Sequence, residues 1–453
     1  MLKQAGHNVI RQNHIGDWGT QFGMLAWYLD YKKYEIDATL HEKGLTRKKK
    51  FSSEDLIPDV ENFYREAKKL FDTDPEFAEK SREYVVNFHS GAKDVMFNWE
   101  IIRSQSLSHC FKIYNLLGVK FDREKDIRGE SFYRDKLADV VNDLKKQGLA
   151  VESDGAICVF PEGFKTKEGN PMPFIIQKTD GAFLYATTDL AALRYRIDEL
   201  KADEIIYVTD ARQKQHFEML FKVAEMAGWA KDTKLVHITF GSVLGEDGKP
   251  LKTRSGENVK LKELLDEAVK RAKQVVEEKN PELAENEKEN IAQAVGIGAV
   301  KYADYTNNRT SDYIFSFDKM LAMEGNTAPY MQYAYARIKS IGRKGEEKGI
   351  DTAKELKELK EIYLNEPTEF ELAKQLIRYN EAFNTAIADF KPNFLTAYLY
   401  ELAGKFSGFY NACPVLDAEP KIRASRLLLC ELTAQTIRHG LENLLGIKTI
   451  DSM

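Results

Sequence analysis

The chain has 453 residues, which is enough for about two to four domains and a large buried core. Its charged fraction of 30% and hydrophobic fraction of 43% are ordinary for a soluble globular protein. The net charge of −5 excludes nucleic-acid binding through bulk charge, so any such contact depends on a local basic face. No apolar run is long enough to span a bilayer and the start is not a signal peptide, so we expect a cytoplasmic protein without a membrane partner.

The beginning of the chain lacks the usual opening of a nucleotide-binding sheet. Residues 1–6 are typical of a helix end that stops at Gly6, and residues 7–13 of a strand. A doubly wound sheet usually opens with a strand, a glycine-rich turn and then a helix. We therefore expect a strand and a turn upstream of Met1 to be missing from this chain.

A glycine-spaced segment follows and leads into an amphipathic helix over 24–31. Its three glycines, Gly16, Gly19 and Gly23, allow the backbone to approach a ligand or another element closely. The polar ends of Asp17 and Gln21 and the flat ring of Trp18 accompany them. Residues 52–118 then predict charged amphipathic helices, and the stretch from roughly 120 to 175 an insertion of loops and hairpins.

The next informative stretch is 180–217, where a helix to Leu200 precedes a strand over 204–208 and a polar loop that ends at His216. A strand that runs into a polar loop is where open α/β sheets bind ligands. Thr187 or Thr188 is the expected N-cap of the helix. Tyr185 and Asp189 are four residues apart and share a helical face, which suits a small cationic ligand. The alternative is that Asp189 only favours the helix N-terminus and Tyr185 belongs to the core.

A strand over 237–243 is followed by a glycine-containing loop over 245–256. Lys252 and Arg254 in this loop are candidates for contacts with polyphosphate oxygens, and the alternative is an ordinary solvated loop. Amphipathic helices are predicted over 261–279 and 290–304, and almost only helix beyond 324. The four cysteines lie far apart without the paired spacing of a zinc site, so we expect reduced, mostly buried thiols and no structural metal.

Several of these strings together resemble the class I arginyl-tRNA synthetases. The matching strings are 13–23, Tyr185 with Asp189, Gln213 with His216, 325–334, and the end of the chain over 426–453. The resemblance covers essentially the whole chain. It implies an α/β plus all-α protein, with a Rossmann-like catalytic domain over 1–325 and a helical anticodon-binding domain over 326–453.

The resemblance also implies a reaction and its partners. ATP, accompanied by Mg²⁺, activates arginine to arginyl-adenylate, and the arginyl group then passes to the 3′ end of tRNA(Arg). In this family the first step requires bound tRNA. We expect a monomer that acts in protein synthesis.

The family's site residues match particular positions of this sequence. The implied arginine-binding residues are Asp189, Tyr185, Gln213, Trp18 and Gln21. A guanidinium is a planar fork that prefers carboxylate partners, so Asp189 is the expected specificity anchor. The implied catalytic and ATP-binding residues are His216, Lys252 and Arg254, with the two cations on the leaving pyrophosphate.

The family's first signature, a His-x-Gly-His turn, is expected upstream of Met1, and the string from His14 to Asp17 only looks like it. The resemblance therefore implies that this chain alone is impaired or inactive in catalysis. One alternative is a non-catalytic tRNA-binding remnant or assembly partner. A cysteinyl-tRNA synthetase has a similar helical domain, but the absence of clustered zinc-ligand cysteines argues against it.

Overall fold

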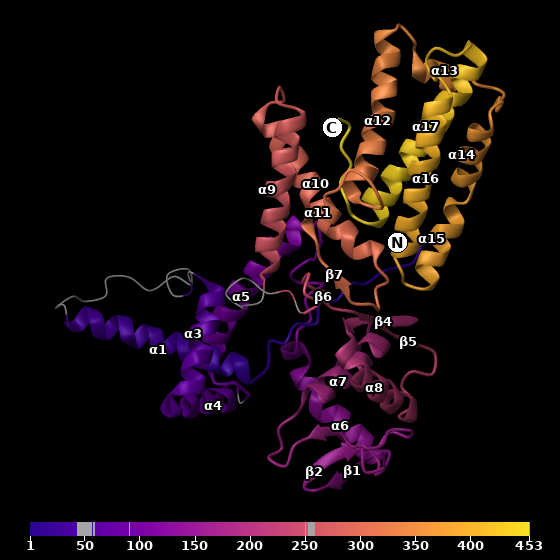
Figure 1. The fold of residues 1–453 in the computed structure, drawn as a ribbon. Coiled ribbons are helices and arrows are strands. Elements are labelled where there is room, and N and C mark those ends of the chain that lie inside the picture. Colours follow the sequence, from indigo (N-terminus) through magenta and orange to yellow (C-terminus); the bar gives the residue numbers. More distant parts are fainter. Residues whose placement is uncertain (43–56, 58, 90, 250, 252–258, 453) are drawn as a thin grey trace. The chain divides into compact units, whose positions relative to one another are not determined.

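The computed structural model describes residues 1–42, 57, 59–89, 91–249, 251 and 259–452. The chain divides into two compact units. The first comprises Met1–Val9, Ile206–Lys214 and Val236–Met453, and the second Ile10–Ile205 with Gln215–Leu235. Figure 1 shows the elements of each.

Four long helices form one part of the second unit: α1 (Thr20–Glu42), α3 (Val60–Thr73), α4 (Pro75–His89) and α5 (Lys93–Leu116). Their apolar faces share a core that includes Leu25, Tyr28 and Phe88. A Cβ atom on Gly23 would lie 2.4 Å from a Val85 side-chain atom and 2.9 Å from its Cα. Gly23 therefore serves the close approach of α1 to α4, which is one of the two uses the sequence indicated for these glycines.

The rest of the second unit contains a small antiparallel sheet with helices beside it. It comprises η1 (Glu130–Lys136), α6 (Leu137–Lys146), β1 (Ala150–Ser153), β2 (Ala156–Val159), β3 (Phe174–Gln177), α7 (Tyr185–Asp198) and most of α8 (Lys214–Met226). The strand order is β1-β2-β3, and both pairings are antiparallel. The hairpins expected in this stretch include the β1–β2 pair, and Gly155 turns the chain between these strands at a φ of 77°.

The expected N-cap of α7 was wrong. The helix begins at Tyr185 with Leu184 as its N-cap, so both threonines lie within its first turn. The Thr187 hydroxyl donates to the carbonyl oxygen of Ile176 in β3 instead. The Thr187 hydroxyl therefore bonds to a residue distant in the sequence and does not cap the helix.

The first unit contains two strand pairs. β4 (Glu204–Asp210) pairs with β5 (Lys234–Phe240), and β6 (Val243–Leu244) pairs in parallel with β7 (Tyr313–Ile314).

The strand expected over 7–13 is wrong for the described structure. There Asn13 forms one isolated parallel bridge, with Ile127, because its amide and carbonyl groups bond to Asp126 and Arg128.

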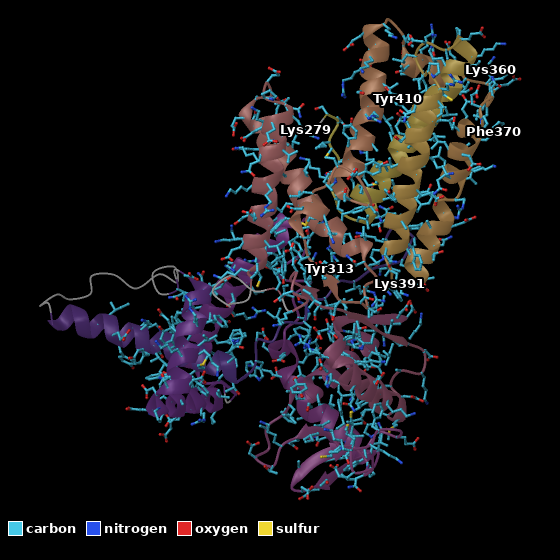
Figure 2. All side chains as sticks on the ribbon, in the orientation of Figure 1. Lys279, Tyr313, Lys360, Phe370, Lys391 and Tyr410 are labelled. Atoms are coloured by element: carbon cyan, nitrogen blue, oxygen red, sulfur yellow. The ribbon has the colours of Figure 1, made fainter. Side chains whose placement is uncertain are left out.

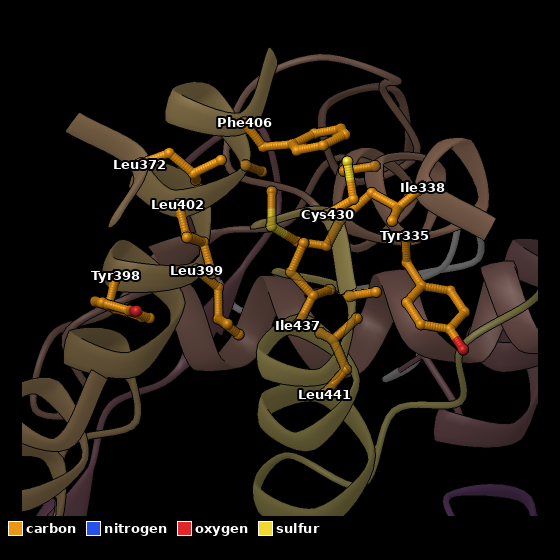
Figure 3. Packing of buried hydrophobic residues seen from close by; sticks show 14 of the residues in the cluster. Tyr335, Ile338, Leu372, Tyr398, Leu399, Leu402, Phe406, Cys430, Ile437 and Leu441 are labelled. Carbon is orange, nitrogen blue, oxygen red and sulfur yellow. The ribbon is translucent and has the colours of Figure 1, made fainter. Parts of the chain in front are cut away.

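Helices dominate the remainder of the first unit. α9 (Leu261–Lys279), α10 (Glu285–Thr306) and α11 (Phe317–Met320) precede α12 (Ala328–Glu347), α13 (Thr352–Glu358), α14 (Pro367–Ile377), α15 (Tyr379–Ala388), α16 (Asn393–Ala412), α17 (Pro420–Arg438) and η3 (His439–Leu444). The helices predicted over 261–279 and 290–304 are confirmed by α9 and α10. Figure 3 shows the core of the C-terminal bundle, where Leu399, Phe406 and Ile437 are buried.

The four cysteines are free thiols, and three of them are buried. This agrees with the expected state of these residues. Among the described residues, no helix is both long enough and apolar enough to cross a membrane.

Candidate functional site

Asp189 lies in the second turn of α7, at the centre of a polar cluster in the second unit. One carboxylate oxygen lies 2.7 Å from Nε2 of His216 and the other 3.7 Å from Nε2 of His14. The first turn of α7 contains no acidic residue, so Asp189 does not act as a charge at the helix N-terminus. The interpretation of Asp189 as a helix-favouring residue is therefore wrong.

His216 reaches Asp189 from the start of α8. Its ring centroid lies 5.6 Å from that of Phe174 and 5.4 Å from that of Tyr185. Tyr185 itself is 65% exposed, so it does not belong to the core. Its ring stands one turn before Asp189 on α7, as the four-residue spacing predicted.

His14 covers the other side of the Asp189 carboxylate. Its ring stacks against Tyr133 at 5.7 Å between centroids, and within the described structure its Nδ1 atom is buried without a hydrogen-bond partner. Burial lowers the pKa of His14 and outweighs the opposing effect of the Asp189 charge. The His14 imidazole is therefore neutral near pH 7 and does not compensate the charge of Asp189.

Asp17 is fully buried in the loop before α1. Its carboxylate accepts hydrogen bonds from Arg103 Nε at 2.8 Å and from the amide and hydroxyl groups of Ser131 at 2.9 Å. A Cβ atom on Gly129 would lie 2.4 Å from both carboxylate oxygens of Asp17. Glycine at 129 thus allows the chain before η1 to pass directly over Asp17.

That passage places Glu130 beside Asp17, and sequence reasoning missed this residue. Burial, together with the charges of Asp17 and Asp189, raises the pKa of Glu130 to about 7, against the lowering effect of a hydrogen bond from the Trp18 amide. A carboxyl group with such a pKa, among other carboxylates, marks a place that favours an added positive charge. The available signal was the Gly-Glu-Ser string at 129–131, which lay in a stretch interpreted as an insertion.

Two arginines of this unit bond to other groups than Asp189. Arg103 pairs with Asp17, and Arg196 donates to the side chain of Gln12 at 2.8 Å. In the described part of the chain, the partners of Asp189 are two imidazoles and not a guanidinium or ammonium group. The cluster can therefore bind a small cation that supplies several N–H donors.

Trp18 and Gln21 take part in the helical cluster of the same unit. The Trp18 ring packs on Phe88 at 4.0 Å between centroids, with the Arg134 guanidinium 5.6 Å from the ring centre. Gln21 lines a hollow of about 710 Å³ between α1 and α3, together with Tyr64 and Phe71. Their expected contact with arginine stays a prediction.

The other expected site residues lie outside this unit or outside the described residues. Gln213 ends η2 (Ala211–Gln213), is exposed, and belongs to the first unit. Lys252 and Arg254 lie outside the described residues, so the structure adds nothing to their predicted phosphate contacts.

Two family models match the chain. The catalytic domain of class I (R) tRNA synthetases matches residues 1–317, and the DALR anticodon binding domain matches residues 331–453. The predicted boundary, between residues 325 and 326, lies in the interval between the two models. The matches confirm the predicted fold class, an α/β catalytic domain followed by a helical C-terminal domain.

Curated relatives and solved structures agree with these models. The arginine–tRNA ligase of Chromobacterium violaceum is 48% identical over 454 residues, which cover 100% of this chain and 75% of the relative. That of Crocosphaera subtropica is 51% identical over 459 residues, with 100% and 74% coverage. The arginyl-tRNA synthetase structure from Plasmodium falciparum superposes with a TM-score of 0.80 at 30% identity, covering 100% of this chain and 71% of that one. The Thermus thermophilus arginyl-tRNA synthetase structure superposes with a TM-score of 0.76 at 25% identity, covering 100% of this chain and 77% of that one.

Proposed function

Because this chain belongs to the class I arginyl-tRNA synthetases and is an arginine–tRNA ligase that uses ATP, we propose that Asp189 and Glu130 bind the guanidinium group of its arginine. The raised pKa of Glu130 beside Asp189 and Asp17 is the observation that carries this proposal. A guanidinium presents five N–H donors in a planar fork and stays protonated at any physiological pH. It therefore offers both carboxylates a partner that is charged at every such pH.

His216 holds the Asp189 carboxylate by a hydrogen bond until arginine arrives, and His14 lies near the other carboxylate oxygen. A carboxylate has about four acceptor positions, so it can keep one imidazole contact and still accept from the substrate. Tyr185, exposed and one turn away on α7, is suited to cover the bound side chain with its ring. The proposed roles of Trp18, Gln21 and Gln213 in arginine binding rest on the resemblance alone.

On the nucleotide side we propose that Lys252 and Arg254 contact the pyrophosphate that leaves ATP, with His216 near the adenosine or the phosphates. Magnesium enters with ATP as part of the substrate. The carboxylate oxygen of arginine attacks the α-phosphorus of ATP, the bond to the β-phosphate oxygen breaks, and arginyl-adenylate and pyrophosphate result. Because arginine supplies the nucleophile, the protein contributes positioning and charge stabilisation.

The adenylate then reacts with the ribose hydroxyl of the tRNA 3′ adenosine, and AMP leaves. The anticodon domain, over 331–453, belongs to the part of the protein that recognises tRNA. We further propose that the protein is a cytoplasmic monomer. The non-catalytic alternative is not retained, since the comparisons identify an enzyme.

Competition between substrate analogues tests the arginine site. Agmatine keeps the guanidinium and lacks the carboxylate, whereas citrulline replaces the guanidinium by a neutral urea of the same shape. In arginine-dependent tRNA charging by the intact protein, we expect agmatine to compete with arginine and citrulline to bind roughly 100-fold more weakly than arginine, as loss of a charged partner predicts. Equal inhibition by citrulline and agmatine would contradict the proposal that Asp189 and Glu130 recognise the guanidinium of arginine.

A further inference from the structure

Arg309 joins two parts of the first unit that belong to different family domains. Its Nε donates to the carbonyl oxygen of Phe390 at 3.0 Å, and its Nη1 donates to the carbonyl oxygen of Thr239. Thr239 lies in β5 of the catalytic domain, and Phe390 lies in the turn between α15 and α16 of the anticodon-binding domain. One side chain thus bridges both domains within a single compact unit.

The turn that receives Arg309 is fixed within the helical domain. Phe390 has a φ of 52°, and its amide donates to the Ile387 carbonyl at 3.1 Å. The next amide, that of Lys391, donates to Ala386 at 2.9 Å, and Lys391 is labelled in Figure 2. A movement of α15 and α16 therefore carries the Phe390 carbonyl with it.

The loop that carries Arg309 is fixed in turn to the catalytic sheet. The Arg309 carbonyl accepts from the Gly241 amide at 2.9 Å, and Asp312 Oδ1 accepts from the Ser242 amide at 2.6 Å. A Cβ atom on Gly241 would lie 2.5 Å from the carbonyl carbon of Ser311, so the two segments are in direct backbone contact. Beyond it, β6 and β7 pair in parallel.

Two residues before Thr239 on the same strand, His237 links β5 to β4. The His237 ring nitrogen Nε2 lies 2.7 Å from the Thr209 hydroxyl, across the β4–β5 pair. Asp210 follows Thr209 and caps η2 by accepting from the Arg212 amide at 2.8 Å. η2 ends at Gln213, a proposed arginine-binding residue. The contacts therefore form a series from the α15–α16 turn to Gln213.

We propose that Arg309 is a positioning residue that couples tRNA binding by the anticodon domain to arginine activation through the β4–β5 pair. A guanidinium can hold two carbonyl groups at once because its donors form a rigid fork, whereas lysine offers a single ammonium group. The proposal rests on the arginine–tRNA ligase reaction and on the family's expected dependence of the first step on tRNA. It does not depend on Asp189 or Glu130 as arginine ligands.

The test is arginine-dependent exchange between pyrophosphate and ATP in the intact protein, with and without saturating tRNA. Arg309→Met should lower the stimulation by tRNA at least about fivefold, the lower end of ordinary coupling, with little change in the tRNA dissociation constant. Arg309→Lys should restore part of the stimulation. The matched control is Arg343→Met, which removes a guanidinium bond to the Asp451 carbonyl within the anticodon domain and should leave the stimulation unchanged.

A double-mutant cycle with Thr209→Val separates coupling from general damage. If Arg309 and Thr209 act in one series, the fold-loss of tRNA stimulation in the double variant should be smaller than the product of the fold-losses in the two single variants. Unchanged stimulation in Arg309→Met, or a loss that arises only from weaker tRNA binding, would overturn the inference while leaving the ligase function intact. Wild-type protein without any tRNA stimulation would overturn the inference as well, and absence of exchange even with tRNA would also contradict the ligase reaction.

Discussion

Nε2 of His216 lies 2.7 Å from the Asp189 carboxylate although 27 positions separate the two residues. This bond joins the start of α8 to α7, and it gives the proposed specificity anchor a hydrogen-bond partner before arginine binds. His14, whose pKa is lowered by burial, lies near the other carboxylate oxygen, and in the described part of the chain Asp189 pairs with no arginine or lysine. A preorganised carboxylate of this kind binds a guanidinium without first displacing an arginine or lysine side chain.

The pKa of Glu130 predicts how arginine binding depends on pH. Arginine requires the ionised carboxylate, and the free site holds that carboxyl at a pKa of about 7. The arginine dissociation constant should therefore fall about tenfold between pH 6 and pH 8 and level off above pH 8. His14 does not account for this change, because its pKa is lowered by burial. Calorimetric titrations across this range measure the dependence.

Glu130→Gln should bind arginine more weakly and lose most of the pH dependence, while Glu124→Gln, an exposed change in the same loop, should keep both. The same raised pKa affects stability in the opposite direction. The folded protein retains a proton on Glu130 that the unfolded chain releases from its ordinary value of 4.5 upward, so the contribution of Glu130 to stability falls as pH rises from 4.5 to about 7. A wild-type profile without pH dependence would contradict the role of Glu130.

Gly23→Ala should destabilise the four-helix part of the second unit. The new methyl group would lie 2.9 Å from Val85 backbone atoms, so the α4 backbone would have to move to accommodate it. Overpacking of this kind costs about 1–3 kcal/mol, more than the helix propensity gained from alanine. Urea unfolding followed by tryptophan fluorescence measures the loss, since Trp18, Trp27 and Trp99 pack in or against this core.

The matched control is Gly404→Ala, because Gly404 lies on α16 with open space around the position of a Cβ atom. Alanine there should be neutral or stabilising by up to about 1 kcal/mol, as followed by circular dichroism. Equal effects of the two substitutions would mean that helix propensity alone decides both.

The buried ion pair between Glu369 and Arg426 predicts a large stability effect in the anticodon domain. Burial tends to raise the pKa of Glu369, but hydrogen bonds from the Glu366 amide, Arg426 and the Asn365 amide outweigh it and lower the pKa. Glu369→Gln leaves the Arg426 guanidinium buried without its charged partner and should cost about 3–5 kcal/mol. Urea unfolding followed by circular dichroism at pH 7 measures this cost.

A matched exposed pair, Arg378 with Glu381, provides the comparison, and Glu381→Gln should cost at most about 1 kcal/mol. Because the folded-state pKa of Glu369 is lowered, its contribution is fully present above the unfolded value of 4.5 and is lost as pH falls below it. The stability losses caused by Glu369→Gln and Glu381→Gln should therefore become more similar as the pH falls below 4.5. A constant difference between them at every pH would contradict the ion pair as the cause.

The sequence predicted the parts of the site that lie close together in the chain. Tyr185 and Asp189 share a face of α7 because four residues make about one helical turn. Glu130 escaped prediction because its environment depends on Asp17, whose contact with the 129–131 loop spans 114 positions. No local pattern reveals a contact of that separation.

The strand expected over 7–13 shows the same limit for the fold. A short segment forms a strand only where another strand supplies hydrogen bonds, and the described structure provides one bridge for 7–13, at Asn13. Helices α9 and α10 were predicted well because their periodicity is sustained over five to six turns. Thr187 illustrates how a tertiary acceptor, the Ile176 carbonyl, overrides a local capping preference.

The central claim, that Asp189 recognises the guanidinium of arginine, is tested most directly by the steady-state kinetics of Asp189→Asn in the intact protein. Loss of a charged partner for a buried guanidinium should lower kcat/KM for arginine by an amount equivalent to about 2–5 kcal/mol, with little change in KM for ATP. Asp198→Asn, an exposed change at the end of the same helix, is the control and should leave both parameters unchanged. A normal kcat/KM for arginine in Asp189→Asn, or an equal loss for arginine and ATP, would contradict the account.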